Sequence, residues 1–259
     1  KRYNQYLIIR LHRYEFQDDK LMNAIKWENI DLVIFVNESI RKEFLKKYPN
    51  VNTLCIPNAI DCQKFKLTNR TEQNTILTYS MHFTELKAYL ELINIFNKII
   101  LLDPNYYLTI AAQKPLSNKH KQYYLKCCTL IKKLKLTEYV TIKFLSTDKF
   151  SLNEINNLLN TNNAIISFSN IESFHYSFAE GLLSGLHGFC RGWRDPDPKE
   201  FWEKWCYSNE KSLIRGVIDW GTKNIQKRIE TAKENREYII DNFSKETIGE
   251  KYYNQVLKI

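Results

Sequence analysis

Short apolar runs alternate with amphipathic stretches along this 259-residue chain, and this alternation constrains its fold more than any other feature. The apolar runs 31–36 (DLVIFV), 75–79 (TILTY) and 164–168 (AIISF) have the length and composition of buried strands. Between them, residues 86–102 carry apolar side chains at three- and four-residue steps, which predicts a long helix. Strands that alternate with helices of this length predict βαβ units, and therefore an α/β fold built on parallel sheets.

The same pattern predicts the remaining elements. Further strands are expected at 6–11, 51–56, 107–111 and 140–144, and further helices at 39–47, 119–134 and 152–159. The stretch from 223 to 259 is charged and is predicted to be helical.

The glycines and cysteines exclude several protein classes. All seven glycines lie at or after Gly181, so no G-x-G-x-x-G follows a predicted strand, and there is no phosphate-loop motif. Dinucleotide-binding enzymes and P-loop nucleotidases are therefore not expected. The six cysteines include no C-x-x-C pair and no histidine at zinc-finger spacing, so we expect reduced thiols, no metal and a cytoplasmic protein.

A net charge of +9 raises the question of an anionic partner. The stretch 119–135 (KHKQYYLKCCTLIKKLK) predicts a basic amphipathic helix. Peripheral contact with an anionic membrane at its inner face is one interpretation, and a solvated helix face is the other. No apolar run is long enough to span a membrane, and no nucleic-acid-binding signature is present, so nucleic acid is not an expected partner.

Residues 164–185 (AIISFSNIESFHYSFAEGLLSG) contain the best candidate site. The strand predicted at 164–168 ends in a polar loop, and a helix is predicted to begin near Ser177. Ligands of open α/β sheets bind beyond the carboxyl ends of the strands, so Glu172 and Glu180 should face one crevice. Carboxylates suit the hydroxyl pairs of a sugar, and a helix start suits a pyrophosphate. Gly181 and Gly185 should let the helix pack closely on the sheet. The alternative interpretation of the whole segment is a helix with an acidic first turn that binds no ligand.

The spacing Glu172-x7-Glu180 resembles the donor-site motif of family-4 retaining glycosyltransferases, which have the two-Rossmann GT-B fold. The motif of that family is E-[GS]-F-G-x4-E-[AG]-x3-G, and the matching residues here are Glu172, Ser173, Phe174, Glu180, Gly181 and Gly185. His175 stands where the family has glycine. Residues 56–61 (IPNAID) resemble the turn that closes the first domain of the family, and 76–79 with Lys87 resemble the start of its second domain.

The resemblance implies a role for each matching residue. Glu180 would hold the ribose hydroxyls of a donor, and Glu172 would act at the donor sugar as a catalytic group. Lys87 would bind the donor phosphates, with the helix start near Ser177 stabilising the leaving diphosphate without a metal. Phe174 and His175 would complete the donor pocket.

The chain departs from the family at the phosphate-binding cation. The family has an arginine five residues before its lysine, and His82 occupies that position here. Three alternatives stay open: His82 binds phosphate, another cation such as Arg191 does so, or catalysis is weak.

Two further segments have both a functional and a plain interpretation. His12 follows the predicted strand at 6–11 and resembles a histidine that some family members direct at the donor sugar, and a surface residue is the alternative. Residues 188–205 (GFCRGWRDPDPKEFWEKW) could line a sugar or acceptor groove, or form a packing loop that leads into a helix.

The resemblance also implies the domain organisation. Residues 1–58 would be the C-terminal remnant of an incomplete acceptor-side Rossmann domain, 59–222 the donor-binding Rossmann domain, and 223–259 helices that pack back across both. A truncated chain, a split enzyme with a partner chain and a naturally reduced protein would each explain the short first domain, and we favour truncation.

The function implied is transfer of a sugar from a nucleotide-diphosphate sugar, UDP- or GDP-linked, to a glycan, lipid-linked or protein acceptor, with retention of anomeric configuration. No further cofactor is expected. The alternative is a non-catalytic nucleotide-sugar or glycan-binding module that serves as a subunit or scaffold.

Overall fold

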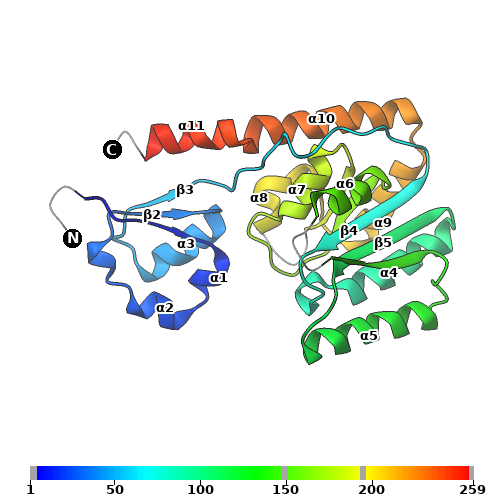
Figure 1. Ribbon diagram of the computed structural model, residues 1–259, viewed down its shortest axis with the longest axis horizontal. Helices are drawn as coiled ribbons and strands as arrows, with labels where there is room; N and C mark the ends of the chain where they lie inside the picture. Colours follow the sequence, from blue (N-terminus) through cyan, green and yellow to red (C-terminus); the bar gives the residue numbers. More distant parts are fainter. Residues whose placement is uncertain (1–4, 147–150, 193–196, 257–259) are drawn as a thin grey trace.

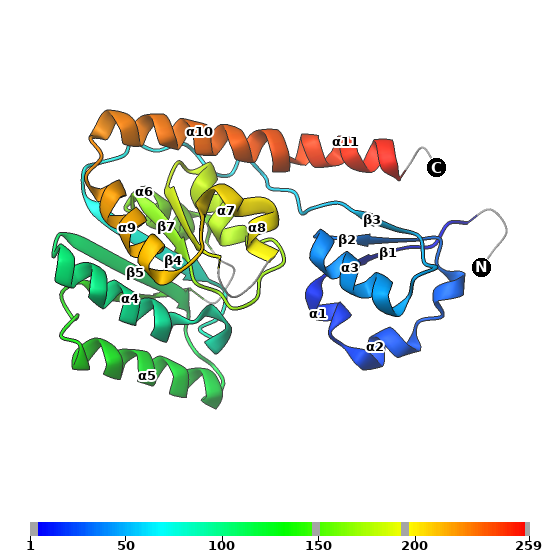
Figure 2. The same cartoon turned by 180° about the vertical axis from the view of Figure 1, so that it is seen from behind.

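A computed structural model of the chain describes residues 5–146, 151–192 and 197–256 (Figure 1). It contains two parallel sheets, one of three strands near the N-terminus and one of six strands. Two consecutive C-terminal helices run along both sheet units, as the front and back views show (Figures 1 and 2). Within the described ranges, no helix is long and apolar enough to cross a membrane.

The smaller unit is a three-stranded sheet in the order β1-β2-β3 with short helices on one face. Its elements are β1 (Ile8–Leu11), α1 (Arg13–Phe16), α2 (Asp19–Ala24), the 3-10 turn η1 (Trp27–Asn29), β2 (Leu32–Phe35), α3 (Glu38–Lys47) and β3 (Thr53–Cys55). Phe44 of α3 is fully buried against Phe35 of the central strand, with ring centroids 4.9 Å apart. The predicted strands and helix of this segment are therefore confirmed, with ends shifted by up to two residues.

The larger unit carries the six-stranded sheet. Its elements are β4 (Asn74–Ser80), η2 (Glu85–Lys87), α4 (Tyr89–Leu102), β5 (Tyr106–Gln113), α5 (Asn118–Lys133), β6 (Val140–Leu145), α6 (Leu152–Asn160), β7 (Ala164–Ser167), α7 (Tyr176–Leu183), β8 (His187–Arg191), α8 (Asp197–Trp202), η3 (Glu203–Trp205), β9 (Cys206–Tyr207) and α9 (Glu210–Gly221). The chain ends in α10 (Ile225–Phe243) and α11 (Lys245–Gln255).

All six strands are parallel and lie in the order β6-β5-β4-β7-β8-β9. Counted from β4, this is the order 3-2-1-4-5-6 of a doubly wound Rossmann sheet. The direction of winding reverses between β4 and β7, so the crevice beyond the carboxyl ends of these two strands is the expected ligand site.

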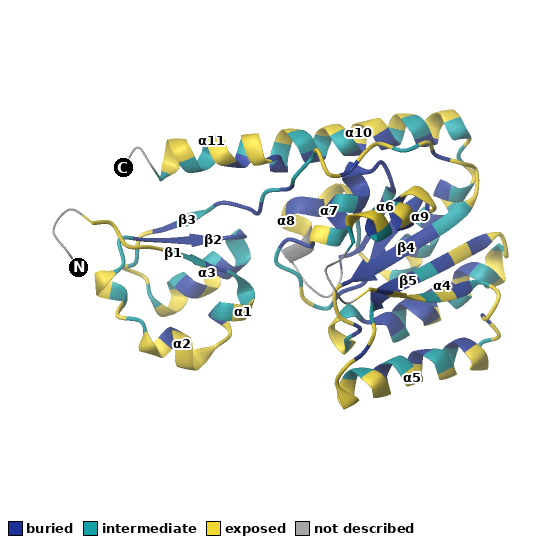
Figure 3. Cartoon of the chain, viewed as in Figure 1, coloured by how far each residue is buried: buried dark blue, intermediate teal, exposed yellow. Residues whose placement is uncertain are grey.

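Helices cover both faces of this sheet, and its strands β4, β7 and β8 are largely buried between them (Figure 3). Helices α4, α5 and α9 share one apolar core with the sheet, and α6, α7, α8 and α10 share the other. Helix α5 packs on α4 through Tyr123, Cys127 and Ile131, and its basic residues lie on the outer side. Helix α11 leaves the larger unit and packs on β2 and β3, where Ile248 is buried beside Leu32 and Ile34.

Two predicted elements are wrong in part. The helix expected at 86–102 begins only at Tyr89, because Ala88 adopts a left-handed conformation (φ 49°) that separates the turn η2 from α4. The packing loop expected from residue 188 is instead strand β8, which is buried between β7 and β9. Gly188 makes this strand hard to recognise, yet a Cβ there would lie 2.7 Å from Trp205 and 2.8 Å from Phe178. The close approach of those rings therefore requires glycine.

Candidate functional site

A cavity of about 440 Å³ lies at the switch point between β4 and β7. Its lining comes from the end of β4, the turn η2, helix α6, the loop after β7 and the start of α7. The lining residues are Tyr79, Ser80, Met81, Lys87, Ile155, Glu172, His175, Tyr176, Ser177 and Glu180. Both glutamates of the predicted site therefore face one crevice, together with Lys87, His175 and Ser177.

Glu172 and Lys87 form an ion pair between the loop after β7 and the turn η2. The left-handed Ala88 ends that turn directly after Lys87 and so directs the lysine at the loop rather than along α4. Burial opposes ionisation of Glu172, but the neighbouring His175 and Lys87 outweigh it and hold the pKa of Glu172 below its ordinary value. Because His175 is itself neutral at neutral pH, Lys87 is the cation that keeps Glu172 ionised there.

Glu180 has a different environment from Glu172. It lies on α7 and accepts a hydrogen bond from the hydroxyl of Tyr79, at the end of β4. Burial raises the pKa of Glu180 to about 7, against the smaller opposing effects of that hydrogen bond and of Lys64. The two carboxylates are thus separated in acidity, and Glu180 gains or loses its proton near neutral pH.

His175 occupies the position where the motif of family-4 glycosyltransferases has glycine. Its backbone is left-handed, with φ 62° and ψ 68°. A side chain in this region costs about 1 kcal/mol or more, which explains why glycine suits the position. The imidazole is buried, and burial lowers the pKa of His175 to about 4. Its Nδ1 lies 3.2 Å from Ser177 Oγ, and its Nε2 lies 3.9 Å from Glu172 Oε1.

The loop that carries Glu172 is anchored from two sides. Asn37 of the smaller unit donates its amide to the carbonyl oxygen of Ser173 at 3.0 Å. Trp202 of α8 donates its indole N–H to the carbonyl oxygen of Phe174, also at 3.0 Å. These bonds fix the loop before any ligand arrives, and one of them links the two sheet units at the site.

Gly181 and Gly185 have different structural roles. A Cβ on Gly181 would lie 2.5 Å from Ile165 of β7, so this glycine does allow the helix to pack closely on the sheet. The same expectation for Gly185 is wrong, because α7 ends before it. Gly185 is left-handed (φ 88°) and closes the helix with bonds from its own N–H to Leu182 and from Leu186 N–H to Gly181.

Four of the predicted or alternative site residues lie outside the cavity. Phe174 is buried in an aromatic cluster with Phe201 and Trp202, because the loop turns its ring into the core. His82 is exposed, and its backbone carbonyl accepts a bond from Ser80. His12 is the N-cap residue of α1 on the smaller unit, and its backbone N–H donates to the carboxylate of Glu15. Arg191 is buried at the end of β8, where it pairs with Glu91 at 2.6 Å.

Sequence reasoning missed Tyr79, Asn37 and Trp202 as supporting residues. Tyr79 could have been predicted from the sequence, because it ends the predicted strand 75–79 at the carboxyl edge where ligands bind. Asn37 and Trp202 contact the loop across sequence separations of 136 and 28 residues, and no local sequence pattern predicts such contacts. Among the residues that the structure describes, no group of three or more His, Cys, Asp or Glu side chains could hold a metal ion.

No protein-family model matches this sequence, and a search of curated proteins finds no match. Solved structures do match the fold. S. aureus TarM is 19% identical, with a TM-score of 0.77 over 97% of this chain and 50% of TarM. Anabaena HepE in complex with UDP is 14% identical, with a TM-score of 0.78 over 98% of this chain and 73% of HepE. A glycosyltransferase from Rickettsia africae is 19% identical, with a TM-score of 0.70 over 96% of this chain and 68% of that enzyme.

These matches confirm the fold class, which is α/β with parallel Rossmann-like sheets of the GT-B glycosyltransferase type. The chain spans about half the length of TarM. At these identities the likeness concerns the fold, and the chemistry of the site has to be argued from its own residues.

Proposed function

We propose that this chain carries the donor site of a glycosyltransferase that moves a sugar from a nucleotide-diphosphate sugar to an acceptor with retention of anomeric configuration. The observation that carries the proposal is the convergence of Glu172, Glu180 and Lys87 on one cavity at the switch point of a Rossmann sheet. HepE has been crystallised with UDP and with UDP-glucose, which supports a nucleotide sugar as the ligand class.

Each residue has a role that its surroundings support. Glu180 can accept hydrogen bonds from ribose hydroxyls once it is ionised, and Tyr79 holds its carboxylate in place. Lys87 and the N–H groups at the start of α7 can stabilise the negative charge that develops on the leaving diphosphate. Glu172, fixed by Lys87, would act at the donor sugar, with Ser177 and His175 at the same wall.

The acceptor side of the proposal rests on the smaller unit. Residues 1–58 would be part of an acceptor-side domain, and a glycan, lipid-linked or protein acceptor would enter between the units. Asn37 already joins this unit to the loop of Glu172. His12, at the start of α1, would reach a donor sugar only if the two units close further.

The second candidate function is a non-catalytic nucleotide-sugar-binding module. It is favoured by one observation: among the described lining residues, Lys87 is the single Lys or Arg, and it already pairs with Glu172. Such a site could bind a donor and yet stabilise the leaving group poorly.

The test measures binding and turnover separately. Titration calorimetry with UDP, GDP and ADP should show saturable binding of one of them, and Glu180→Ala should abolish it while the matched control Glu237→Ala, on the exposed side of α10, should not. Undiminished nucleotide affinity in Glu180→Ala would refute the assignment of Glu180 to the ribose hydroxyls. Release of nucleotide from the matching donor sugar decides for the enzyme, and binding without release decides for the module.

A further inference from the structure

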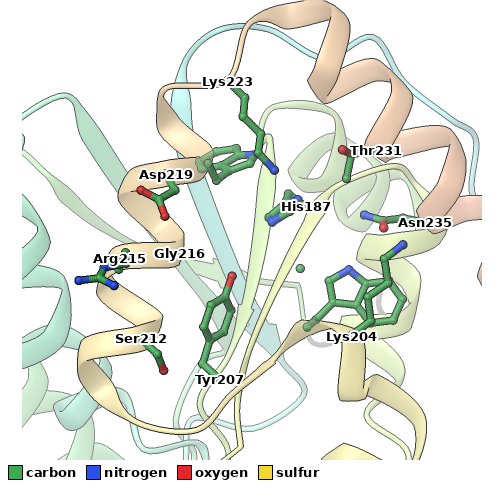
Figure 4. Close-up of a pocket in the computed structure, with 13 residues that line it drawn as sticks. His187, Lys204, Tyr207, Ser212, Arg215, Gly216, Asp219, Lys223, Thr231 and Asn235 are labelled. Atoms are coloured by element: carbon green, nitrogen blue, oxygen red, sulfur yellow. The ribbon is translucent and has the colours of Figure 1, made fainter.

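A second cavity, of about 430 Å³, lies at the β8-β9 side of the six-stranded sheet (Figure 4). It is bounded by the start of β8, by η3 and β9, and by helices α9 and α10. Its volume is within the range of roughly 300–1,000 Å³ that is usual for small-molecule sites. It shares no described lining residue with the candidate donor pocket, so the two are separate sites.

Two buried polar atoms in this cavity lack a partner among the described residues. Asn235 is fully buried and donates its amide to the carbonyl oxygen of Leu186 at 2.9 Å, but its Oδ1 accepts no bond. The Nδ1 atom of His187 likewise has no partner. Both atoms are buried from solvent, and leaving such an atom unsatisfied costs about 1–3 kcal/mol, so a small shift of either side chain toward a ligand hydroxyl would supply the missing hydrogen bond.

The imidazole of His187 is held in its neutral form. It stacks on the indole of Trp220 at an interplanar angle of 16°. Burial, followed by the nearby charges of Lys223, Lys204 and Arg228, lowers the pKa of His187 to about 3. A neutral imidazole has one acceptor and one donor nitrogen, so together with Asn235 it can meet hydroxyl groups.

Lys223 is the basic side chain that this lining offers to an anion. Three basic side chains line the cavity, Lys204, Arg215 and Lys223, against one acid, Asp219. Lys204 lies 3.7 Å from Glu234, whereas the described residues offer no ion pair to Lys223. Figure 4 shows the ammonium end of Lys223 directed toward His187, while Arg215 extends away from the cavity.

Aromatic side chains complete the walls, namely Trp205, Trp220 and Tyr207. Figure 4 shows the hydroxyl of Tyr207 directed into the cavity. Apolar ring surfaces suit the C–H faces of a sugar ring, and the polar atoms beside them suit its hydroxyls. We propose that this cavity binds a sugar that carries a phosphate or carboxylate group, with the anionic group at Lys223 and the hydroxyls at Asn235 and His187.

The test uses the whole chain and defined probes. Glucose 6-phosphate, glucuronic acid, glucose and inorganic phosphate would each be titrated by protein-observed NMR. We expect saturable binding of at least one of the two anionic sugars, with glucose and phosphate roughly tenfold weaker or worse, because each lacks half of the contacts. Phosphate that binds as tightly as glucose 6-phosphate would show an anion site only and would overturn the proposal, as would the absence of saturable binding by both anionic sugars.

Variants locate the binding. Lys223→Ala should weaken it roughly tenfold or more, through loss of a charge-assisted bond, while Lys227→Ala, an exposed lysine of α10 outside the cavity, should leave it unchanged. Thr231→Phe should block the cavity without removing a charge. Excess UDP and the Glu180→Gln variant should not affect this binding, which separates it from the proposed function. Full affinity in both Lys223→Ala and Thr231→Phe would refute the site.

Discussion

Glu180→Gln should stabilise the protein, although Glu180 is the residue we place at the centre of the donor site. Burial raises the pKa of Glu180 from 4.5 to about 7, so the folded protein resists an ionisation that the unfolded chain permits. At about 1.4 kcal/mol per pKa unit, this difference corresponds to roughly 3 kcal/mol of lost stability in the ionised state.

The loss has a defined pH window. Since the folded pKa is raised, the stabilising contribution is fully present below the unfolded value near 4.5 and is lost as pH rises through about 7. A glutamine side chain keeps the shape, can accept the bond from Tyr79 and never ionises. We therefore expect Glu180→Gln to match the parent near pH 4.5 and to exceed its stability by up to about 3 kcal/mol at pH 8.

Urea unfolding at several pH values between 4.5 and 8.5 measures this difference directly, since the change in midpoint gives the change in free energy. Glu237→Gln is the matched control, because Glu237 is exposed on α10 and should show no such trend. A stability difference between Glu180→Gln and the parent that stays constant across the pH range would refute burial of an ionisable carboxyl as its cause.

Three further predictions follow from the same geometry. If ribose hydroxyls bind the carboxylate form of Glu180, nucleotide affinity measured by calorimetry should rise roughly tenfold between pH 6 and pH 8 and then level off, and a flat profile would contradict this. Lys87→Met should destabilise the fold by up to about 3 kcal/mol at pH 7 by leaving Glu172 buried without its cation, and adding Glu172→Gln should restore most of the loss in urea unfolding. Gly185→Ala should cost about 1–3 kcal/mol, because φ is 88° and the new Cβ would lie 2.5 Å from Leu67, whereas Gly249→Ala, with open space around it in α11, should be neutral or stabilising in the same assay.

Local patterns were sufficient to predict the parallel sheet and most of its strands. The segments 31–36, 75–79 and 164–168 are short apolar runs rich in β-branched residues, and each contains a strand that is mostly buried. Strand β8 was missed because its glycine and polar ends resemble a loop, and only its neighbours β7 and β9 make it a strand. The interruption of the helix at Ala88 was missed for a related reason. Alanine favours helix, and no local sequence signal predicts a left-handed residue there.

The candidate site was predictable where it follows one segment of chain, and less so where it depends on packing. Glu172 and Glu180 share a loop and helix, and their convergence follows from the switch-point rule. Phe174 lies in the same segment, but which way its ring turns depends on Trp202 and Phe243, which come later in the sequence. The pairing of Lys87 with Glu172 likewise depends on a backbone break that the helical pattern concealed.

That ion pair leads to a last prediction about the ligand. A diphosphate at Lys87 would draw the ammonium away from Glu172, whose carboxylate would then be buried with less compensation. Hydroxyls of a donor sugar could supply the missing hydrogen bonds, whereas a nucleotide alone could not. We therefore expect the intact donor sugar to bind more tightly than its nucleoside diphosphate, and we expect Glu172→Gln, which has no charge to compensate, to reduce that preference. Calorimetry on both ligands with both proteins measures the coupling, and an equal preference in the parent and Glu172→Gln would show that Glu172 does not contact the sugar.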